Sequence, residues 1–281
     1  MSPLEVGKIV MPVSSGMLER VMTRDTWIVI GAVALIVLLA GLYTVMGIGM
    51  SMSALDMTRM AGPVGESMAM GPPVDWTWGY ALLIFLMWWV MMIAMMTPSA
   101  APVLLLFTAL KRRGPQKTQA TTLGLIFLLG YLLAWMGFSV VATLLQWLTE
   151  NLAITNGRMM TLGSEPVAGM VLLTAGLYQF SSLKTACLRH CRSPAHFLAA
   201  HNRKGYGGAL RMGMHHGAYC LGCCWALMAL LFVGGIMNLY WIVGLAVYVL
   251  VEKLVPYPRL FVRTTGAVLI AAGLLLLVSA F

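Results

Sequence analysis

Residues 213–237, GMHHGAYCLGCCWALMALLFVGGIM, form an apolar stretch that contains two histidines and three cysteines but no charged side chain. The stretch is longer than the ~20 apolar residues that one helical crossing of a bilayer needs. On a helix, with about 100° between successive residues, His216, Cys220 and Cys223 fall within an arc of roughly 60°. Cys224 lies beside this arc, and His215 points elsewhere. The stretch predicts a membrane-spanning helix with one imidazole and several sulfurs on a single face.

The composition of the whole chain indicates an integral membrane protein. Hydrophobic residues make up 60% of the 281 residues and charged residues only 10%, too little charge to cover the surface of a soluble protein of this length. The formal charge of +9 is not accompanied by a basic face or a recognition motif, so nucleic acid is not an expected partner. Lys and Arg instead lie between apolar segments, where their positions indicate which loops face the cytoplasm.

The apolar stretches predict an all-α, polytopic bundle of seven transmembrane helices. The spans run over about Trp27–Ile48, Trp76–Leu110, Thr121–Leu148, Pro166–Leu183, Gly213–Met237, Tyr240–Val255 and Thr264–Phe281. The second stretch is longer than one crossing needs, so Pro98 and Pro102 are expected to kink it or to begin a second short piece. The first is too long for a signal-peptide core and no cleavage site follows it, so we expect a retained span. We assign 1–25 to an N-terminal segment and 26–281 to a single helical domain.

The distribution of positive charge predicts the orientation. With the N-terminus in the cytoplasm and the C-terminus outside, only Arg59 and Arg158 of the 18 Lys and Arg residues fall on the outer side. A Met-rich loop at 49–75 is then outside, and a basic loop at 184–211, rich in Cys and His, is inside. We expect a multi-pass protein of the bacterial cytoplasmic (inner) membrane, with the lipid bilayer as its surroundings.

The cysteines and histidines of the fifth span suggest a metal site. Thiolate and imidazole together suit copper(I) or zinc. Adjacent residues on one helix cannot all reach the same ion, so we expect His216, Cys220 and Cys223 or Cys224 to contribute, with a further ligand from another element. The alternative is that these cysteines are small apolar filler. All five cysteines and all five histidines lie between Cys187 and Cys224, and such clustering favours metal binding over packing.

Two other segments offer metal ligands. Cys187, His190 and Cys191 share about 100° of arc if the fourth helix continues inward, and either a chelating face or a basic turn with buried cysteines would explain them. Met91 and Met95 lie on one face of the second span, with Met96 on its flank. Thioether sulfur prefers copper(I), but a methionine stripe is also common packing. We interpret His196 and His201 as ordinary loop residues.

Several other features carry weaker expectations. The methionines of the 49–75 loop could scavenge copper(I) or pack against a partner subunit. The small pair Gly213-x-x-x-Gly217 permits close helix packing. Glu252 and Lys253 are expected to pair near the inner interface, because charge deeper in the membrane is costly. No nucleophile with a base, no paired catalytic carboxylates and no phosphate-binding loop is recognisable, so the sequence does not favour an enzyme.

Four separated motifs resemble a bacterial family of unknown function described as predicted metal-binding integral membrane proteins. They are Trp88-x-x-Met91-x-x-x-Met95-Met96-x-Pro98-x-x-x-Pro102; Gly176-x-Tyr178-Gln179-x-x-x-Leu183-Lys184-x-x-Cys187-Leu188-x-x-Cys191-Arg192-x-Pro194; Gly217-x-x-Cys220-x-Gly222-Cys223-Cys224-Trp225-x-Leu227-Met228; and Glu252-Lys253. The resemblance covers roughly residues 76–256. It implies a helical membrane protein and a metal but no reaction. The Met-rich loop lies outside the matched region, so the resemblance does not support copper capture there.

Two functions are consistent with these observations. The first is copper(I) handling, with zinc as the alternative metal, in which the protein moves, stores or delivers the ion to a membrane enzyme. The second is a non-catalytic accessory subunit of a larger membrane enzyme, or a homo-oligomer, in which the cysteines only pack. Transport with its own cycle is a third possibility, but the inverted repeats common in transporters are not visible.

Overall fold

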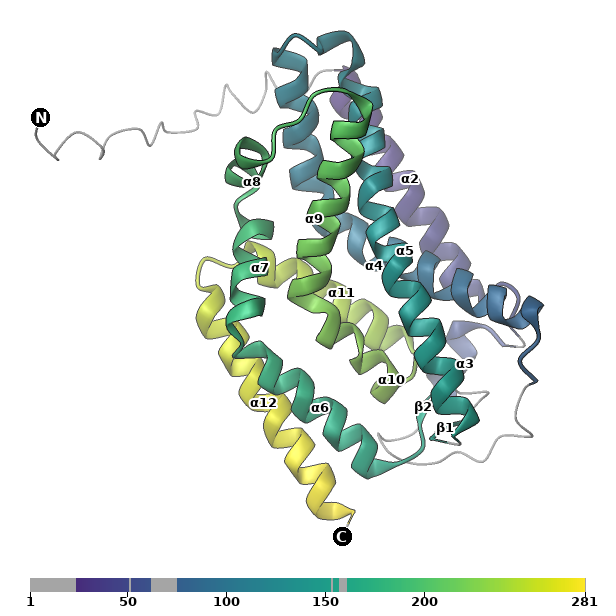
Figure 1. Cartoon of the computed structure of the whole chain (residues 1–281). Helices are drawn as coiled ribbons and strands as arrows, with labels where there is room; N and C mark the ends of the chain where they lie inside the picture. Colours follow the sequence, from purple (N-terminus) through teal and green to yellow (C-terminus); the bar gives the residue numbers. More distant parts are fainter. Residues whose placement is uncertain (1–23, 51, 62–74, 153, 157–160, 281) are drawn as a thin grey trace, which may run out of the picture.

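The computed structural model describes residues 24–50, 52–61, 75–152, 154–156 and 161–280 (Figure 1). Most of the expected N-terminal segment, 1–25, lies outside the described residues. Met68 and Met70 of the expected Met-rich loop also lie outside them.

The described residues form helices and one short hairpin. The helices are α2 (Arg24–Met46), α3 (Ala54–Met60), α4 (Trp78–Arg113), the 3-10 turn η1 (Lys117–Gln119), α5 (Ala120–Asn151), α6 (Glu165–Gln179), α7 (Ser182–Arg192), α8 (Pro194–Ala200), α9 (Gly205–Met228), α10 (Leu230–Gly234), α11 (Leu239–Leu254) and α12 (Pro258–Ser279). Strands β1 (Thr155–Asn156) and β2 (Thr161–Leu162) pair antiparallel between α5 and α6, with Thr155 opposite Leu162. The expected all-α class is confirmed.

The number of candidate spans is smaller than the sequence predicts. Five helical segments of the described chain are long and apolar enough to cross a bilayer, or six if α6 and α7, bent by 63° relative to one another, count as one broken span. The expectation of seven independent spans is therefore not met. The expected span at 240–255 forms α11, whose 16 residues rise only about 24 Å, less than the ~30 Å of the hydrocarbon core.

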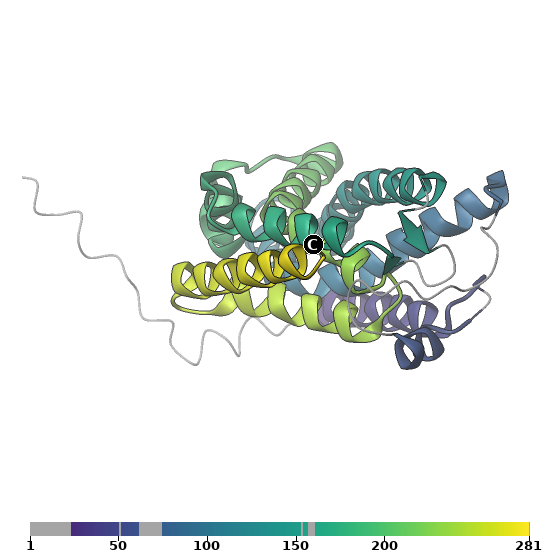
Figure 2. The same cartoon turned by 90° about the horizontal axis from the view of Figure 1, so that it is seen from below.

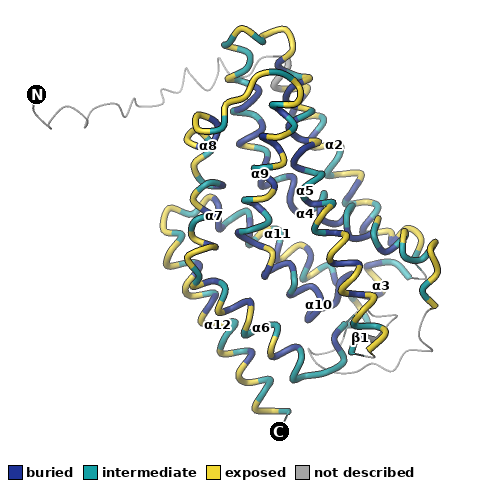
Figure 3. Tube along the Cα trace, in the orientation of Figure 1, coloured by how far each residue is buried: buried dark blue, intermediate teal, exposed yellow. Residues whose placement is uncertain are grey.

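Helices α4, α5 and α9 form the centre of the molecule. Helix α5 contacts both α4 and α9 extensively, α2 packs on α4, and α7 packs on α9. Figure 3 shows buried residues concentrated on these central helices. Large apolar side chains such as Leu144, Leu177 and Leu275 are exposed on the outside, as expected for surfaces that face lipid. Helices α6 and α12 lie side by side at one flank (Figure 2).

Three local expectations are corrected or refined. The segment 184–211 is not a loop, because α7, α8 and the beginning of α9 occupy most of it. Pro98 and Pro102 lie inside the single helix α4 and do not begin a second piece. In the expected Met-rich loop, Met57 is buried on the short helix α3, so packing explains this methionine.

Helices α5 and α9 approach each other through glycine, as Gly213-x-x-x-Gly217 predicts. A Cβ atom added at Gly213 would lie 1.9 Å from the carbonyl oxygen of Phe127, and one at Gly130 would lie 2.2 Å from that of Leu210. Backbone therefore meets backbone at this interface, which only glycine permits. The close approach brings the cysteine-bearing face of α9 against α5.

Replacing Gly213 with alanine is expected to destabilise the protein. The new methyl group collides with the backbone of α5, which cannot move aside as a side chain would, and such overpacking costs about 1–3 kcal/mol. Thermal unfolding in mild detergent measures the effect. Gly137→Ala on α5 is the matched control, because nothing lies within 4 Å of its added Cβ. Equal midpoints for the two variants would contradict the close contact.

Candidate metal centre

Cys220 lies at the centre of a buried cluster of sulfur and polar groups. Its side chain is fully buried near the middle of the 205–234 helical segment. The sulfur Sγ lies 3.2 Å from the ammonium Nζ of Lys253 on α11 and 3.2 Å from the hydroxyl oxygen of Tyr131 on α5. Three helices therefore meet at one sulfur atom.

Three further cysteines surround Cys220. The thiol of Cys191, on α7, interacts with those of Cys220 and Cys223. The thiols of Cys223 and Cys224 donate to the carbonyl oxygen of Cys220, at 3.1 and 3.0 Å. The thiols of Cys223 and Cys224 therefore bind the backbone of Cys220, and the Cys220 sulfur itself faces Lys253, Tyr131 and Cys191. Cys191 thus brings a sulfur from a second helix next to Cys220.

The fifth cysteine stands apart from this cluster. Cys187 lies on the same helix as Cys191, one turn earlier, and its sulfur packs against Gly222 of α9. A Cβ atom added at Gly222 would lie 2.7 Å from that sulfur, so the glycine makes room for the thiol. Tyr178 also donates to the carbonyl oxygen of Gly222, which fixes α9 against the end of α6.

Lys253 does not pair with Glu252, contrary to the sequence expectation. Glu252 forms a buried ion pair with Lys184 of α7, with Nζ and Oε1 2.7 Å apart. Lys253 instead donates to Cys220 Sγ and, at 2.7 Å, to the hydroxyl of Ser99 on α4. Adjacent residues on a helix point about 100° apart, so Glu252 and Lys253 reach different neighbours.

His216 is buried one turn before Cys220 on α9, with only 1% of its surface exposed. Its ring lies between aromatic rings, with centroid distances of 5.8 Å to Tyr131, 6.0 Å to Phe127 and 5.3 Å to Phe197. Neither ring nitrogen has a hydrogen-bond partner among the described residues. Buried polar atoms nearly always have a hydrogen-bond partner. The two unpaired ring nitrogens of His216 lie beside the sulfur cluster, so either of them is available to bind a metal ion.

The other histidines lie away from the cluster. His190 stacks on Tyr219 with ring centroids 4.2 Å apart, and its Nδ1 contacts the carbonyl oxygen of Ala186, so the structure does not turn it toward Cys191. His196 is exposed on α8, and His201 stacks on Phe197. His215 makes an edge contact with His201. None of these arrangements suggests a second histidine ligand.

Helix α4 contacts the cluster through its backbone at Met96 and through Ser99. Met91, Met95 and Met96 are all buried. The carbonyl oxygen of Met96 accepts the Tyr131 hydroxyl at 2.9 Å, the same hydroxyl that contacts Cys220. Ser99, which contacts Lys253, lies one turn after Met95 and Met96. These two contacts place this part of α4 next to the residues around Cys220.

The cluster is not a ready-made cage. Within the described residues, no three His, Cys, Asp or Glu side chains are arranged to hold one ion together. A tetrahedral zinc site needs four such ligands, whereas copper(I) accepts a low coordination number and soft sulfur donors. The sulfur-rich donors around Cys220 therefore fit copper(I) better than zinc.

The sequence did not predict that Tyr131 and Ser99 belong to the site, or that Lys253 points toward Cys220. A charged residue within an apolar run is a signal for function by default, and Lys253 carried that signal. Tyr131 and Ser99 gave none that distinguishes them from ordinary membrane-helix residues. Their roles follow only from the packing of α4, α5 and α11 around Cys220.

Comparisons with known proteins identify the family. A search of curated proteins and a search of solved structures each gave no significant match. A family model described as "PpoB2: Copper chaperone" matches residues 85–276, which include every member of the cluster around Cys220. Because this match covers well over half of the chain, the protein belongs to the PpoB2 copper chaperone family.

Proposed function

We propose that this protein binds copper(I) as cargo at the cluster around Cys220 and delivers it to a membrane enzyme. The single observation that carries the proposal is the fully buried Cys220 sulfur, which accepts from the ammonium of Lys253, contacts the hydroxyl of Tyr131 and interacts with Cys191 of another helix. A lysine ammonium next to a buried sulfur favours the thiolate, the form that binds metal. Membership of a copper chaperone family supports copper as the ion.

Cys220 and Cys191 are the proposed principal ligands. They come from α9 and α7, so a single ion between them would join the two helices. A neutral ligand from His216 or from a methionine of α4, Met91, Met95 or Met96, would complete the coordination. Cys223 and Cys224 begin as protonated thiols on the same helix, and each can replace a ligand during exchange. Cys187 and His190 lie at the margin and are assigned no direct role.

Charge balance gives Lys253 a specific part in this proposal. A copper(I) ion held by two thiolates carries one net negative charge, which is costly in a buried, apolar place. The ammonium of Lys253, 3.2 Å from Cys220 Sγ, neutralises that charge. Ser99 accepts a second hydrogen bond from the ammonium and so holds it in position. The complex of ion, thiolates and lysine is then neutral overall.

Removing either principal ligand is expected to abolish copper binding. Protein purified after growth with copper should carry about one ion per chain, and Cys220→Ser and Cys191→Ser should lose most of it, because a hydroxyl is a poor ligand for copper(I). Elemental analysis of the purified protein measures the metal. Cys187→Ser is the matched control and should keep its copper. Full retention in Cys220→Ser, or zinc in place of copper, would refute the proposed site.

Neutralising Lys253 should weaken copper binding without removing a ligand. Lys253→Met leaves the complex with an unbalanced buried charge, a penalty of about 3 kcal/mol that corresponds to a loss of roughly 100-fold in affinity. Competition against a copper(I) chelator in detergent measures the affinity. Lys253→Arg keeps the charge and should lose much less. If Lys253→Met folds, by its unfolding temperature, and binds as tightly as wild type, the charge argument is wrong.

Delivery and transport are distinguished in proteoliposomes. A chaperone passes its ion by ligand exchange to an acceptor that docks on it, so copper should reach a chelating dye outside the vesicle but should not accumulate with dye enclosed inside. Vesicles without protein give the background, and Cys220→Ser vesicles show what depends on the site. Time-dependent colour inside the wild-type vesicles, absent from both controls, would identify a transporter instead.

A further inference from the structure

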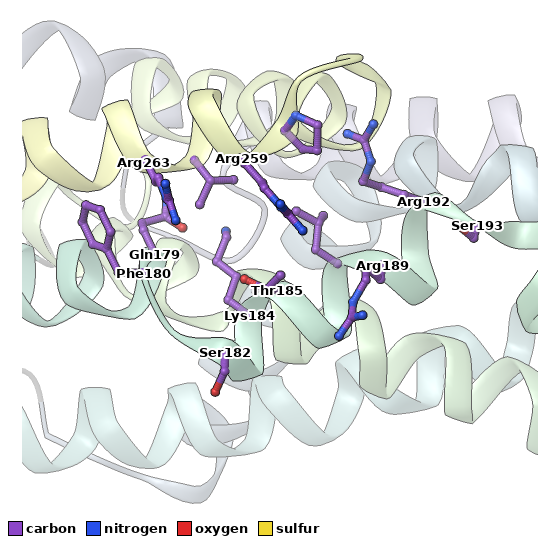
Figure 4. A pocket seen from close by; sticks show the side chains of 13 residues that line it. Gln179, Phe180, Ser182, Lys184, Thr185, Arg189, Arg192, Ser193, Arg259 and Arg263 are labelled. Atoms are coloured by element: carbon purple, nitrogen blue, oxygen red, sulfur yellow. The ribbon is translucent and has the colours of Figure 1, made fainter.

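A basic cavity lies between α7 and α12, at the bend that follows α6. Its volume is about 470 Å³. Five positively charged side chains line it, Lys184, Arg189, Arg192, Arg259 and Arg263, and no acidic side chain is among its lining residues. Figure 4 shows Arg259 reaching from α12 toward α7, with Lys184 pointing up from α7 on the other side. Two helices that are far apart in the sequence thus contribute positively charged side chains to one cavity.

Two of these five cations already have partners. Lys184 is paired with Glu252, and Arg192 donates to the backbone carbonyl oxygens of Glu252 and Val255, at 2.8 and 2.5 Å. In the part of the chain that the structure describes, Arg189, Arg259 and Arg263 form no ion pair. Three guanidinium groups that line one cavity without an acidic partner give it a positive potential, which favours an anion. Basic residues tend to flank membrane spans, and here residues of two helices line the same space.

Gln179 adds an independent sign of a ligand. It lines the same cavity, only 2% of its surface is exposed, and its Oε1 atom has no hydrogen-bond partner among the described residues. Its Nε2 atom donates to the hydroxyl of Tyr248, which leaves Oε1 as the free end of the amide. A buried carbonyl oxygen without a partner is rare, and it calls for a donor such as a hydroxyl group.

The cavity is also partly apolar and lies next to lipid-facing surface. Phe180, Leu188 and Val262 are among its lining residues. Leu183 and Leu260, beside it in the sequence, are exposed. A ligand that fits this surface has a phosphate for the arginines, a hydroxyl for Gln179 and a hydrocarbon chain for the apolar wall. Arginine pairs especially well with phosphate because its planar donors reach two oxygens at once.

We propose that this cavity binds the phosphate headgroup of an anionic phospholipid, of which phosphatidylglycerol has the required hydroxyl groups. The inference does not depend on copper. Basic pockets between membrane helices are a known mode of anionic lipid recognition. The lipid would lie against the bend between α6 and α7, where it also neutralises the arginines. Lys184, whose ammonium also donates to the carbonyl oxygen of Cys223, connects this cavity to the cluster around Cys220.

The test compares an arginine double variant with wild type. Arg259→Gln with Arg263→Gln removes two of the unpaired charges, both on exposed side chains whose loss leaves the core intact. Each phosphate-contacting arginine near the membrane surface is worth about fivefold in affinity, so the double variant should bind roughly 30-fold more weakly. Arg211→Gln, exposed on α9 and outside the cavity, is the matched control.

Binding is measured by the unfolding temperature of the protein in detergent during titration with short-chain phosphatidylglycerol, phosphatidylcholine or inorganic phosphate. Stabilisation by phosphatidylglycerol that is strong in wild type and Arg211→Gln but weak in the double variant supports the lipid site. Stabilisation by inorganic phosphate with the same dependence would assign the cavity to a soluble phosphate instead and overturn the lipid assignment. If no ligand distinguishes the double variant from Arg211→Gln, the cavity is not an anion site. Copper content should stay unchanged throughout.

Discussion

A lysine ammonium buried among membrane helices must find an acceptor, because leaving a charge unpaired there costs several kcal/mol. Lys253 finds its acceptors in Cys220 and Ser99, and the neighbouring Glu252 finds Lys184. These three contacts tie α11 to α4, α9 and α7. They also hold the charged end of α11, a helix too short to cross the bilayer, against polar groups of neighbouring helices.

The face of α9 was predictable because helical periodicity is a local property. His216, Cys220 and Cys223 share one face in the sequence pattern, and all three are buried on the same side of α9. The close approach of α5 was likewise visible in Gly213-x-x-x-Gly217, since small residues four apart permit one helix to touch another. In both cases the information lies within a few turns of a single helix.

The partners of that face were not predictable because they depend on how helices bend and pack. The 63° bend between α6 and α7 turns Cys191 toward Cys220 and leaves His190 stacked on Tyr219. On the sequence alone, the fourth helix is expected to continue straight inward, which would place Cys191 and His190 on one chelating face. The count of seven spans failed for the same reason, because hydropathy gives the length of an apolar run but not whether the helix that it forms bends or stops.

The bend between α6 and α7 also lies next to both the sulfur cluster and the basic cavity. Irregular backbone at membrane depth is tolerated only where protein or a polar cavity surrounds it, and transporters use such breaks to build their sites. Here the buried face of α7 carries both Cys191, which reaches the sulfur cluster, and Lys184, and the exposed Arg189 lines the basic cavity. Lys184 lines the cavity, and its ammonium binds Glu252 and the carbonyl oxygen of Cys223. One short helix, α7, therefore contributes residues both to the sulfur cluster and to the basic cavity.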